Sequence, residues 1–295
     1  MKNTLLFIWI LFLAVSCRTE TESISKPVIS VSIIPQQYFI EQLAGELAEI
    51  NVMIPPGASP ATYEPSVSQL GKLDRSMTYL RIGYVGFEQS WMDKIASVNP
   101  DMRIADLSEG VETILEDMHE PEDHHGHSHY GHTHHGPDPH IWMSVHNARI
   151  IAQNIHNELL LIFPGEKDYL QAKLGHFSLL LDSLHLEITS KLEGIENNKF
   201  MIYHPALSYF ARDYGLEQYS LEIEGKTPSP AHLKEMVDLV HEYQISKVFI
   251  QNQFDRKNAE VLARETGAGI IQFDPLDLNW SEQMRYIAEQ LNPSR

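Results

Sequence analysis

The sequence contains a single cysteine, Cys17, in 295 residues. One cysteine excludes a disulfide framework and a thiolate-rich metal site. Basic residues are also scarce, because 22 Lys and Arg stand against 40 Asp and Glu, which gives a formal net charge of −18 at pH 7. Such a surface repels a phosphate backbone, so we expect no nucleic-acid partner. Histidine, in contrast, is abundant: there are 16, and half of them lie in one short stretch.

Long apolar runs are absent except at the N-terminus. Lys2 precedes an apolar run over residues 5–15, which is too short to cross a bilayer of about 30 Å as a helix. The pattern is typical of a signal peptide, residues 1–16. Small residues before Cys17 resemble the lipobox of bacterial lipoproteins, which implies cleavage before Cys17 and a lipid on its thiol. Residues 17–26 would then form a lipidated tether, and the alternative is ordinary secretion with an incidental free thiol.

Short apolar strands alternate with amphipathic helices from residue 27 onwards, which is typical of α/β layers. The first series predicts an N-terminal lobe, 27–163, and the second a C-terminal lobe, 195–295, each with a parallel-type sheet flanked by helices. The expected strands are 28–33, 50–53, 77–82 and 102–106, then 200–203, 218–223, 247–250 and 270–273. The expected helices are 35–47, 67–74 and 88–98, then 206–214, 231–243, 257–266 and 281–291.

Residues 164–194 connect the two lobes. Their apolar residues recur every third or fourth position, which predicts a helix with one apolar stripe. Roughly 29 residues would give a helix of about 43 Å, a long rigid connector between Pro164 and Gly194. Two shorter helices that meet near Gly175 are the alternative. The stripe consists of Leu170, Leu174, Phe177, Leu181, Leu184, Ile188 and Leu192.

The histidine-rich stretch, residues 119–135, contains eight histidines among Gly, Ser, Asp and Glu. It has almost no apolar residue, so we expect a loop that does not pack. Neutral imidazoles bind Zn²⁺, Ni²⁺ or Cu²⁺, and an expression tag would be terminal and regular. We therefore interpret the stretch as a loop of weak, exchangeable metal sites. The low-affinity ligands are His119, His124, His125, His127 and His129.

Three residues beyond the loop occur where an α/β protein places ligands. His140 follows two prolines in Pro-Asp-Pro-His, which fix the backbone before it. His204 and Asp274 each follow a predicted strand, and open α/β sheets bind ligands at the carboxyl ends of their strands. Taken alone, His140 could be a satisfied core histidine, and Asp274 could form an Asx-type turn or a helix cap.

Taken together, these segments resemble the solute-binding lipoproteins of zinc and manganese ABC importers, the ZnuA-like and TroA-like group (cluster A-I). The resemblance covers nearly the whole mature chain. It implies one metal ion in the cleft between the lobes, held by His140 from the first lobe and by His204 and Asp274 from the second. The ordered motifs are VSIIPQQYFIEQLAG, PPGASPATYEP, DPHIWMSVHNARIIAQNI after the loop, YHPALSYFARDYGL, EGKTPSPAHL and FDPL.

The sequence departs from this family at Ala61. Members usually carry a histidine immediately before Thr-Tyr-Glu-Pro, and a methyl group cannot coordinate a metal. Zn²⁺ prefers four ligands, so three protein ligands leave one position open. A tether from His135 to His140 reaches at most roughly 17 Å. The candidates for the fourth ligand are water, Glu64, His132, His134 and His135.

The resemblance implies a monomeric, non-enzymatic protein that captures Zn²⁺ outside the inner membrane. It would be lipid-anchored at Cys17 on the periplasmic side and would hand the ion to an ABC permease and its ATPase. Two imidazoles favour Zn²⁺ over Mn²⁺, so a manganese-binding homologue is the alternative. The rivals are a zinc-dependent hydrolase and a surface metal-buffering or adhesive lipoprotein. The sequence contains no HExxH motif, which would have indicated a zinc-dependent hydrolase. Glu64 is the only residue whose position suggests a general base.

The remaining conspicuous side chains are expected to be structural. Trp91, Trp142 and Trp280 lie in amphipathic surroundings, which indicates a place in the core or at the lobe interface. Several histidines on predicted helices are expected at the surface or partly buried. These are His156, His176, His185, His232 and His241.

Overall fold

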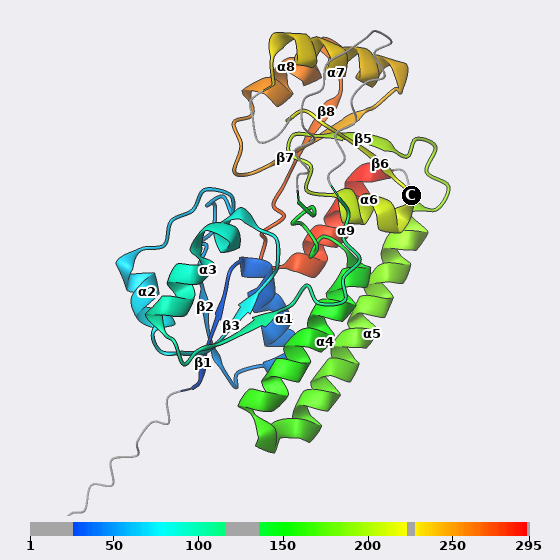
Figure 1. Ribbon diagram of the computed structural model, residues 1–295. Helices are drawn as coiled ribbons and strands as arrows, with labels where there is room; N and C mark the ends of the chain where they lie inside the picture. Colours follow the sequence, from blue (N-terminus) through cyan, green and yellow to red (C-terminus); the bar gives the residue numbers. More distant parts are fainter. Residues whose placement is uncertain (1–25, 116–135, 223–227, 294–295) are drawn as a thin grey trace, which may run out of the picture.

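The computed structural model describes residues 26–115, 136–222 and 228–293. Within these residues the chain forms two parallel four-stranded sheets flanked by helices and joined by a long helix (Figure 1). This confirms the expected fold class. The expected signal peptide 1–16, Cys17 and the histidine-rich loop 119–135 lie outside the described residues. None of the helices in the described part has the length and apolar character needed to cross a membrane.

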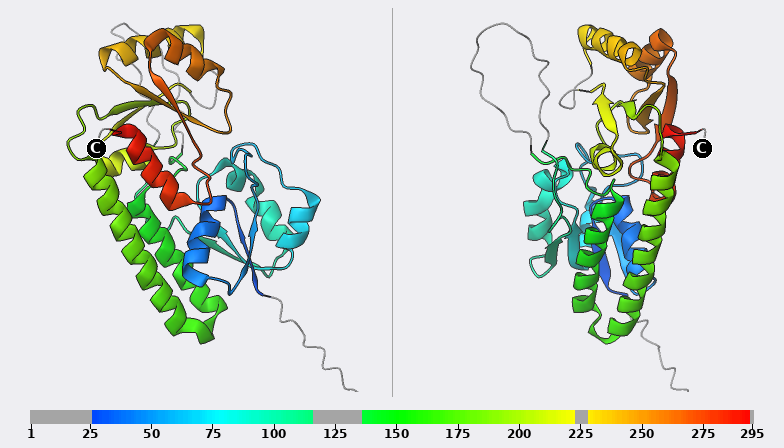
Figure 2. Two further views of the ribbon diagram at one scale, coloured as in Figure 1. Left: turned by 180° about the vertical axis from the view of Figure 1, so that it is seen from behind. Right: turned by 90° about the vertical axis from the view of Figure 1, so that its right-hand side faces the viewer.

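The first sheet has the strand order β2-β1-β3-β4, and every neighbouring pair is parallel. Its central strand β1 is buried on both faces, as expected for a parallel sheet covered by helices on both sides. Figure 2 shows α2 and α3 on one side of the sheet and α1 on the other. The elements are β1 (Val28–Val31), α1 (Ile34–Ala44), β2 (Glu49–Val52), α2 (Val67–Leu73), β3 (Ser76–Arg81), α3 (Gly86–Val98) and β4 (Arg103–Asp106).

The second sheet has the order β6-β5-β7-β8 and is again entirely parallel. It therefore repeats the order of the first sheet, in which the first strand lies between the second and the third. The carboxyl ends of β5, β7 and β8 consequently meet at one edge. The elements are β5 (Lys199–Ile202), α6 (Ser208–Tyr214), β6 (Glu217–Ser220), α7 (Pro230–Glu242), β7 (Lys247–Gln251), α8 (Lys257–Thr266) and β8 (Gly269–Phe273).

One uninterrupted helix, α5 (Lys167–Leu192), joins the two halves after a 3-10 turn at Pro164–Glu166. It passes through Gly175 without a break, so the single long helix is confirmed. All seven residues of the expected apolar stripe are buried. The stripe faces α1, α4 (Val145–Ile162) and α9 (Trp280–Leu291), which pack along α5.

No bounds were predicted for the helix α4, although His156 was expected to lie on a helix. Ser144 caps the first turn of α4 by accepting a hydrogen bond from the N–H of Asn147. His156 on this helix is only 3% exposed. The expectation of a surface or partly buried position was therefore wrong for His156. Its place on the packed face of an amphipathic helix is the physical reason, and burial holds the pKa of this imidazole below its ordinary value.

The main hydrophobic core runs through both halves of the molecule. It includes Phe39 of α1, Phe177 of α5 and Trp280 of α9. The rings of Phe39 and Trp280 lie 5.1 Å apart in an edge-to-face arrangement. A smaller cluster lies between the second sheet and the pair α7 and α8. The C-terminal helix therefore ties the second half to the first.

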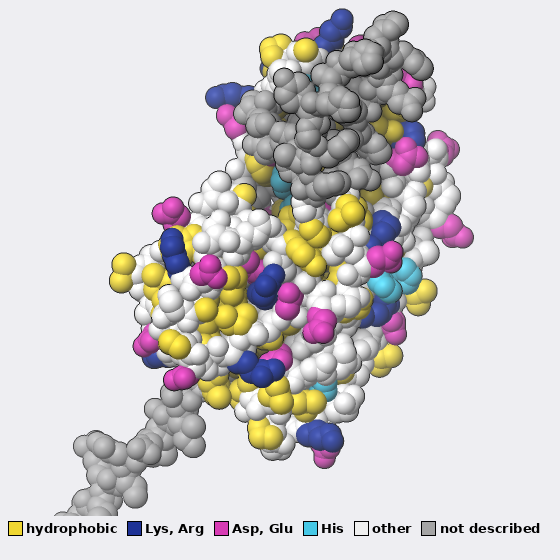
Figure 3. Space-filling view, viewed as in Figure 1, with side chains coloured by type: hydrophobic (Ala, Val, Ile, Leu, Met, Phe, Trp, Pro, Cys, Tyr) yellow, Lys and Arg dark blue, Asp and Glu magenta, His cyan; other side chains and the backbone are white. Residues whose placement is uncertain are grey.

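On the face shown in Figure 3, acidic and basic side chains are interspersed.

Candidate metal centre

His140 and His204 lie side by side, although they come from different halves of the molecule. His140 lies in the loop before α4, and His204 lies two residues after the end of β5. Their ring centroids are 5.1 Å apart, and the ring planes meet at 71°. The structure therefore brings together two of the three ligands expected from the sequence.

The His140 imidazole is held by a buried carboxylate two residues earlier. Oδ1 of Asp138 accepts hydrogen bonds from Nδ1 of His140 at 2.9 Å and from its backbone N–H at 2.8 Å. Burial alone would raise the pKa of Asp138, but the charge and hydrogen bonds of His140 outweigh it and hold the pKa below its ordinary value. Because an ionised carboxylate can only accept, Nδ1 carries a proton, and in the neutral form of the imidazole Nε2 keeps a free lone pair.

His204 has the same kind of partner. Its Nδ1 lies 3.0 Å from Oε2 of Glu222, which is buried. The amide of Gln251, at the end of β7, holds the backbone by donating to the His204 carbonyl at 2.6 Å and accepting from its N–H at 3.4 Å. The ring of Phe254 stacks on the imidazole at 5.3 Å. His204 therefore also presents Nε2, in the carboxylate–histidine arrangement that is common around protein-bound metals.

Asp274 follows β8 and is already engaged through one oxygen. Its Oδ1 accepts hydrogen bonds from Nε2 of Gln253 at 3.0 Å and from the backbone N–H of Leu276 at 2.9 Å. The second bond is the Asx-type turn considered as an alternative for this residue. In the part of the chain that the structure describes, no three His, Cys, Asp or Glu side chains form a group that could hold a metal ion. The structure therefore does not group Asp274 with the two imidazoles.

Two tryptophans link the loop of His140 to the strand end of Asp274. Nε1 of Trp142 donates to the carbonyl of Pro275 at 2.8 Å, and Nε1 of Trp280 donates to the carbonyl of Trp142 at 2.8 Å. Both tryptophans are buried at the junction of the two halves, as the sequence indicated. Trp91 instead stacks on Phe87 within the first half.

Tyr209 of α6 gives the same loop a third attachment. Its hydroxyl donates to the carbonyl of Asp138 at 2.8 Å and accepts from the N–H of Ile114 at 3.2 Å. Burial raises the pKa of this phenol to about 12, so it stays protonated at neutral pH and can donate. The backbone on which His140 lies is therefore fixed against the second half.

The candidate ligand Glu64 does not complete the imidazole pair, and Ala61 has no donor. Ala61 and Glu64 are both exposed, and Glu64 forms no group with His140 and His204. The backbone around Ala61 lies on the first turn of α3, where the N–H of Phe87 donates to the carbonyl of Pro60 at 2.7 Å. The other proposed ligands, including His132, His134 and His135, lie outside the described residues.

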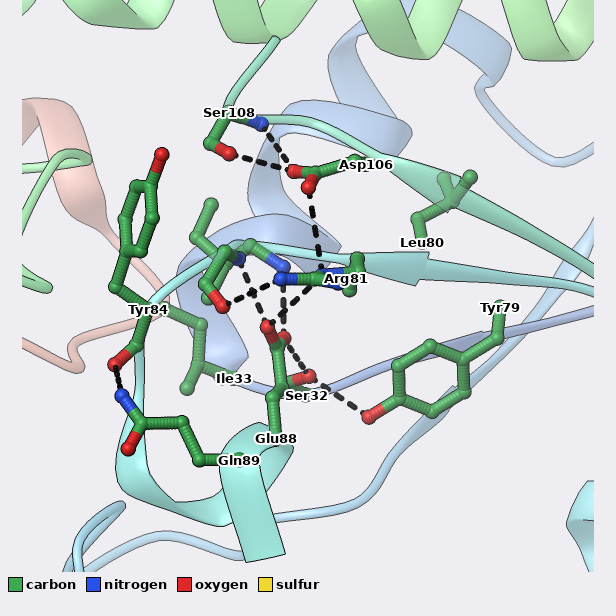
Figure 4. Close-up of polar contacts among 12 residues, drawn as sticks. Ser32, Ile33, Tyr79, Leu80, Arg81, Tyr84, Glu88, Gln89, Asp106 and Ser108 are labelled. Atoms are coloured by element: carbon green, nitrogen blue, oxygen red, sulfur yellow. Dashed lines mark hydrogen bonds and ion pairs between the residues drawn. The ribbon is translucent and has the colours of Figure 1, made fainter. Parts of the chain in front are cut away.

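Glu88 is a buried carboxyl group near the carboxyl ends of β1 and β3 (Figure 4). Its oxygens accept hydrogen bonds from the hydroxyl of Ser32 and from the N–H groups of Ile82 at 2.7 Å and Gly83 at 2.8 Å. Burial raises the pKa of Glu88 to about 7, although these hydrogen bonds and the charge of Arg81 act in the opposite direction. Both oxygens of Glu88 therefore accept hydrogen bonds that hold this turn, and they are not available as metal ligands.

The residues that hold the two imidazoles and their backbone were not predicted from the sequence. Asp138 could have been found, because it precedes His140 by two residues within the motif that drew attention to the histidine. Glu222 and Gln251 had no local signal, since 18 and 47 residues separate them from His204. Only the order of the strands brings them to the same imidazole.

Comparison with known proteins gives a consistent picture. The family model described as ZnuA, zinc-uptake complex component A, periplasmic, matches residues 29–292. A crystal structure of ZnuA is 35% identical, covers 91% of this chain and 99% of that chain, and superposes with a TM-score of 0.83. A manganese-bound point mutant of the periplasmic metal-binding protein from Candidatus Liberibacter asiaticus is 19% identical, with 90% and 100% coverage and a TM-score of 0.76, which shows the fold alone.

A curated relative is the zinc-binding lipoprotein AdcA of Streptococcus pneumoniae R6. It is 27% identical over 267 residues, which are 89% of this chain and 52% of the relative. The chain therefore spans about half the length of this relative.

The family match begins within β1 and extends past the end of α9. It therefore includes both sheets, the joining helix and the segments that carry His140, His204 and Asp274. Proteins of this family are binding components of transport systems, which confirms the expectation that the chain is not an enzyme. The chain belongs to the ZnuA family of periplasmic metal-binding, solute-binding proteins.

Proposed function

We propose that this protein captures Zn²⁺ between its two halves and delivers it to the permease of an ABC importer, which an ATPase drives. The observation that supports this most directly is the pair of imidazoles from opposite halves, 5.1 Å apart. Each ring is oriented by a buried carboxylate on Nδ1 and offers Nε2 to an ion. Two pre-oriented neutral nitrogens are donors that suit Zn²⁺.

Asp274 is the proposed third ligand, and its carboxylate would join the imidazoles when an ion binds. Ala61 offers no donor on the first half, so a water molecule completes a four-coordinate site in our proposal. A loop imidazole or Glu64 would be the replacement for that water. Zinc and manganese both occur among the similar proteins, and the two nitrogen donors favour zinc for this chain.

Proton competition gives the proposed site a pH dependence. Imidazole must be neutral to bind a metal, so protonation weakens binding as the pH falls. We expect zinc affinity to fall markedly below about pH 6, where free imidazole becomes charged. An affinity that stays constant down to pH 5 would contradict imidazole ligation.

The decisive experiment uses protein from which residues 119–135 have been deleted. Zn²⁺ titration against a competing chelator should give one tight site, and His204→Ala should weaken it by at least 100-fold because one of two nitrogens is lost. His176→Ala, on the exposed face of α5, is the matched control and should bind as the parent does. Tight one-to-one binding that survives His204→Ala would overturn the proposed site.

The same deletion tests the role of the loop. An unchanged dissociation constant with a lower stoichiometry would exclude a loop imidazole as the fourth ligand. A weaker tight site would instead place one of these imidazoles on the ion.

We further propose that the protein is monomeric and held on the periplasmic side of a membrane by lipid on Cys17. The similarity to the lipoprotein AdcA supports this location. Cys17→Ser should move the protein from the membrane fraction to the soluble fraction, and an unchanged distribution would contradict the anchor. Genes for a permease and an ATPase beside the gene would favour transport over surface metal buffering.

A further inference from the structure

We infer that Gln253 sets the metal preference of this site by restricting Asp274 to a single coordinating oxygen. The inference rests on the proposed function, because it takes Asp274 as a ligand. Gln253 lies two residues beyond the end of β7, the strand between β5 and β8. It therefore stands between the two strand ends that carry His204 and Asp274.

The two oxygens of Asp274 are in different states. Oδ1 accepts two hydrogen bonds, from Nε2 of Gln253 at 3.0 Å and from the N–H of Leu276 at 2.9 Å. Two donors fill both lone pairs of a carboxylate oxygen. No hydrogen bond between described residues reaches Oδ2, which leaves this oxygen as the one open to an ion. Because a carboxylate only accepts, the amide atom facing Oδ1 is the NH₂ group.

The end of β7 controls both ligands of the second half. The amide of Gln251 forms hydrogen bonds with both the N–H and the carbonyl of His204. The amide of Gln253 donates to the carboxylate of Asp274. Between them the chain turns, with the N–H of Phe254 donating to the carbonyl of Gln251 at 3.2 Å. This turn also places the ring of Phe254 against His204. Gln253 therefore occupies a position fixed by its neighbours.

The number of oxygens that Asp274 can offer matters because ions differ in their demand for ligands. Zn²⁺ is satisfied by four ligands in a tetrahedron, and one carboxylate oxygen serves as one of them. Mn²⁺ favours oxygen donors and six-fold coordination, which a carboxylate that uses both oxygens helps to supply. Because Ala61 offers no donor, Oδ1 of Asp274 would be a further oxygen donor from a ligand that already coordinates through Oδ2. By occupying Oδ1, Gln253 disfavours Mn²⁺ more than Zn²⁺.

The test replaces Gln253 by Met, which has a similar volume and no donor, in the loop-deleted protein. Dissociation constants for Zn²⁺ and Mn²⁺ alone are measured by chelator competition. We expect the preference for Zn²⁺ over Mn²⁺ to fall by at least ten-fold, mainly through tighter Mn²⁺ binding. Zn²⁺ X-ray absorption should show an increase in oxygen ligands. Gln253→Ala is the second variant, should Gln253→Met fold poorly, and is expected to shift the preference in the same direction.

Gln272→Met is the matched control, because Gln272 is an exposed glutamine on β8. It should leave the preference unchanged. If Asp274→Ala abolishes tight Zn²⁺ binding but neither Gln253 variant changes the preference or the oxygen count, the role of Gln253 is wrong and the proposed function stands. If Asp274→Ala leaves tight Zn²⁺ binding intact, the ligand set itself is wrong, and the inference fails with it.

Discussion

The two sheets share one strand order but end differently. In the first sheet, Glu88 joins the ends of β1 and β3 by accepting hydrogen bonds from Ser32, Ile82 and Gly83. In the second sheet the ends of β5 and β8 lead directly into His204 and Asp274. The same topology therefore supports a hydrogen-bonded carboxyl group in one half and the proposed metal donors in the other. The chemistry is decided by the residues placed at the strand ends.

In the proposed site, the halves also differ in how many donors they contribute. The first supplies His140 from a loop before α4, whereas the methyl group of Ala61 supplies no donor. The second supplies His204 and Asp274, with Gln251 and Gln253 holding them. The proposed ion is therefore held mainly by the second half, with the first half closing the site through one buried histidine.

The largest effect that we expect in this comparison comes from removing the carboxylate behind each histidine. Loss of such a partner typically weakens metal binding by about 10- to 100-fold. We expect a loss of zinc affinity in this range for both Glu222→Ala and Asp138→Ala. The loss should be larger for Asp138→Ala, because Asp138 also accepts a hydrogen bond from the backbone N–H of His140. Zinc titration checks both variants.

The matched control for this prediction is Glu235→Ala. Glu235 contacts His232 at 3.3 Å on α7, so it is also a carboxylate beside a histidine, but this histidine is not a proposed ligand. Parent-like zinc binding in both Glu222→Ala and Asp138→Ala would show that these carboxylates do not orient metal ligands.

An intermediate effect is expected from restoring the missing donor on the first half. Ala61→His should tighten Zn²⁺ binding by about ten-fold or more, because a fourth protein ligand replaces water in a tetrahedral site. The exposed neighbour Thr62 gives the control Thr62→His. Equal affinities for the parent and Ala61→His would mean that residue 61 does not face the ion.

The smallest effect on zinc binding is expected for Glu88, whose titration changes stability instead. Because the pKa of Glu88 is raised to about 7, the folded state binds more protons than the unfolded state between pH 4.5 and 7. The contribution of this group to the free energy of unfolding is complete below about pH 4.5 and is lost as the pH rises through 7, by up to about 3 kcal/mol. Urea unfolding at pH 5 and pH 7 should show this decline, and Glu88→Gln should reduce it.

The exposed residue Glu289 on α9 provides the control Glu289→Gln, which should keep the parental decline. A Glu88→Gln variant whose stability changes with pH as the parent's does would show that Glu88 titrates normally. Zinc binding should be little affected in either case, because Glu88 is not among the proposed ligands.

Much of the fold could be predicted because its signals are local. Each strand of the described residues overlaps an expected segment, and the apolar stripe on α5 has a helical period that nearby residues reveal. The expected helix 35–47 ended early, at Ala44, because Gly45 takes a positive φ of 56° and ends the helix. The bounds of α4 were not predicted, and the burial of His156 on its packed face was missed.

The sequence by itself determined the alternation of strands and helices, the long connector and the identity of the candidate ligands, because periodicity and motifs are properties of neighbouring residues. Only the tertiary structure decided that His140 and His204 meet, and that Asp138, Glu222 and Gln253 contact the proposed donors. These contacts depend on strand order and on the way α5 and α9 join the halves. The pairing of residues far apart in the chain leaves no local pattern from which it could be read.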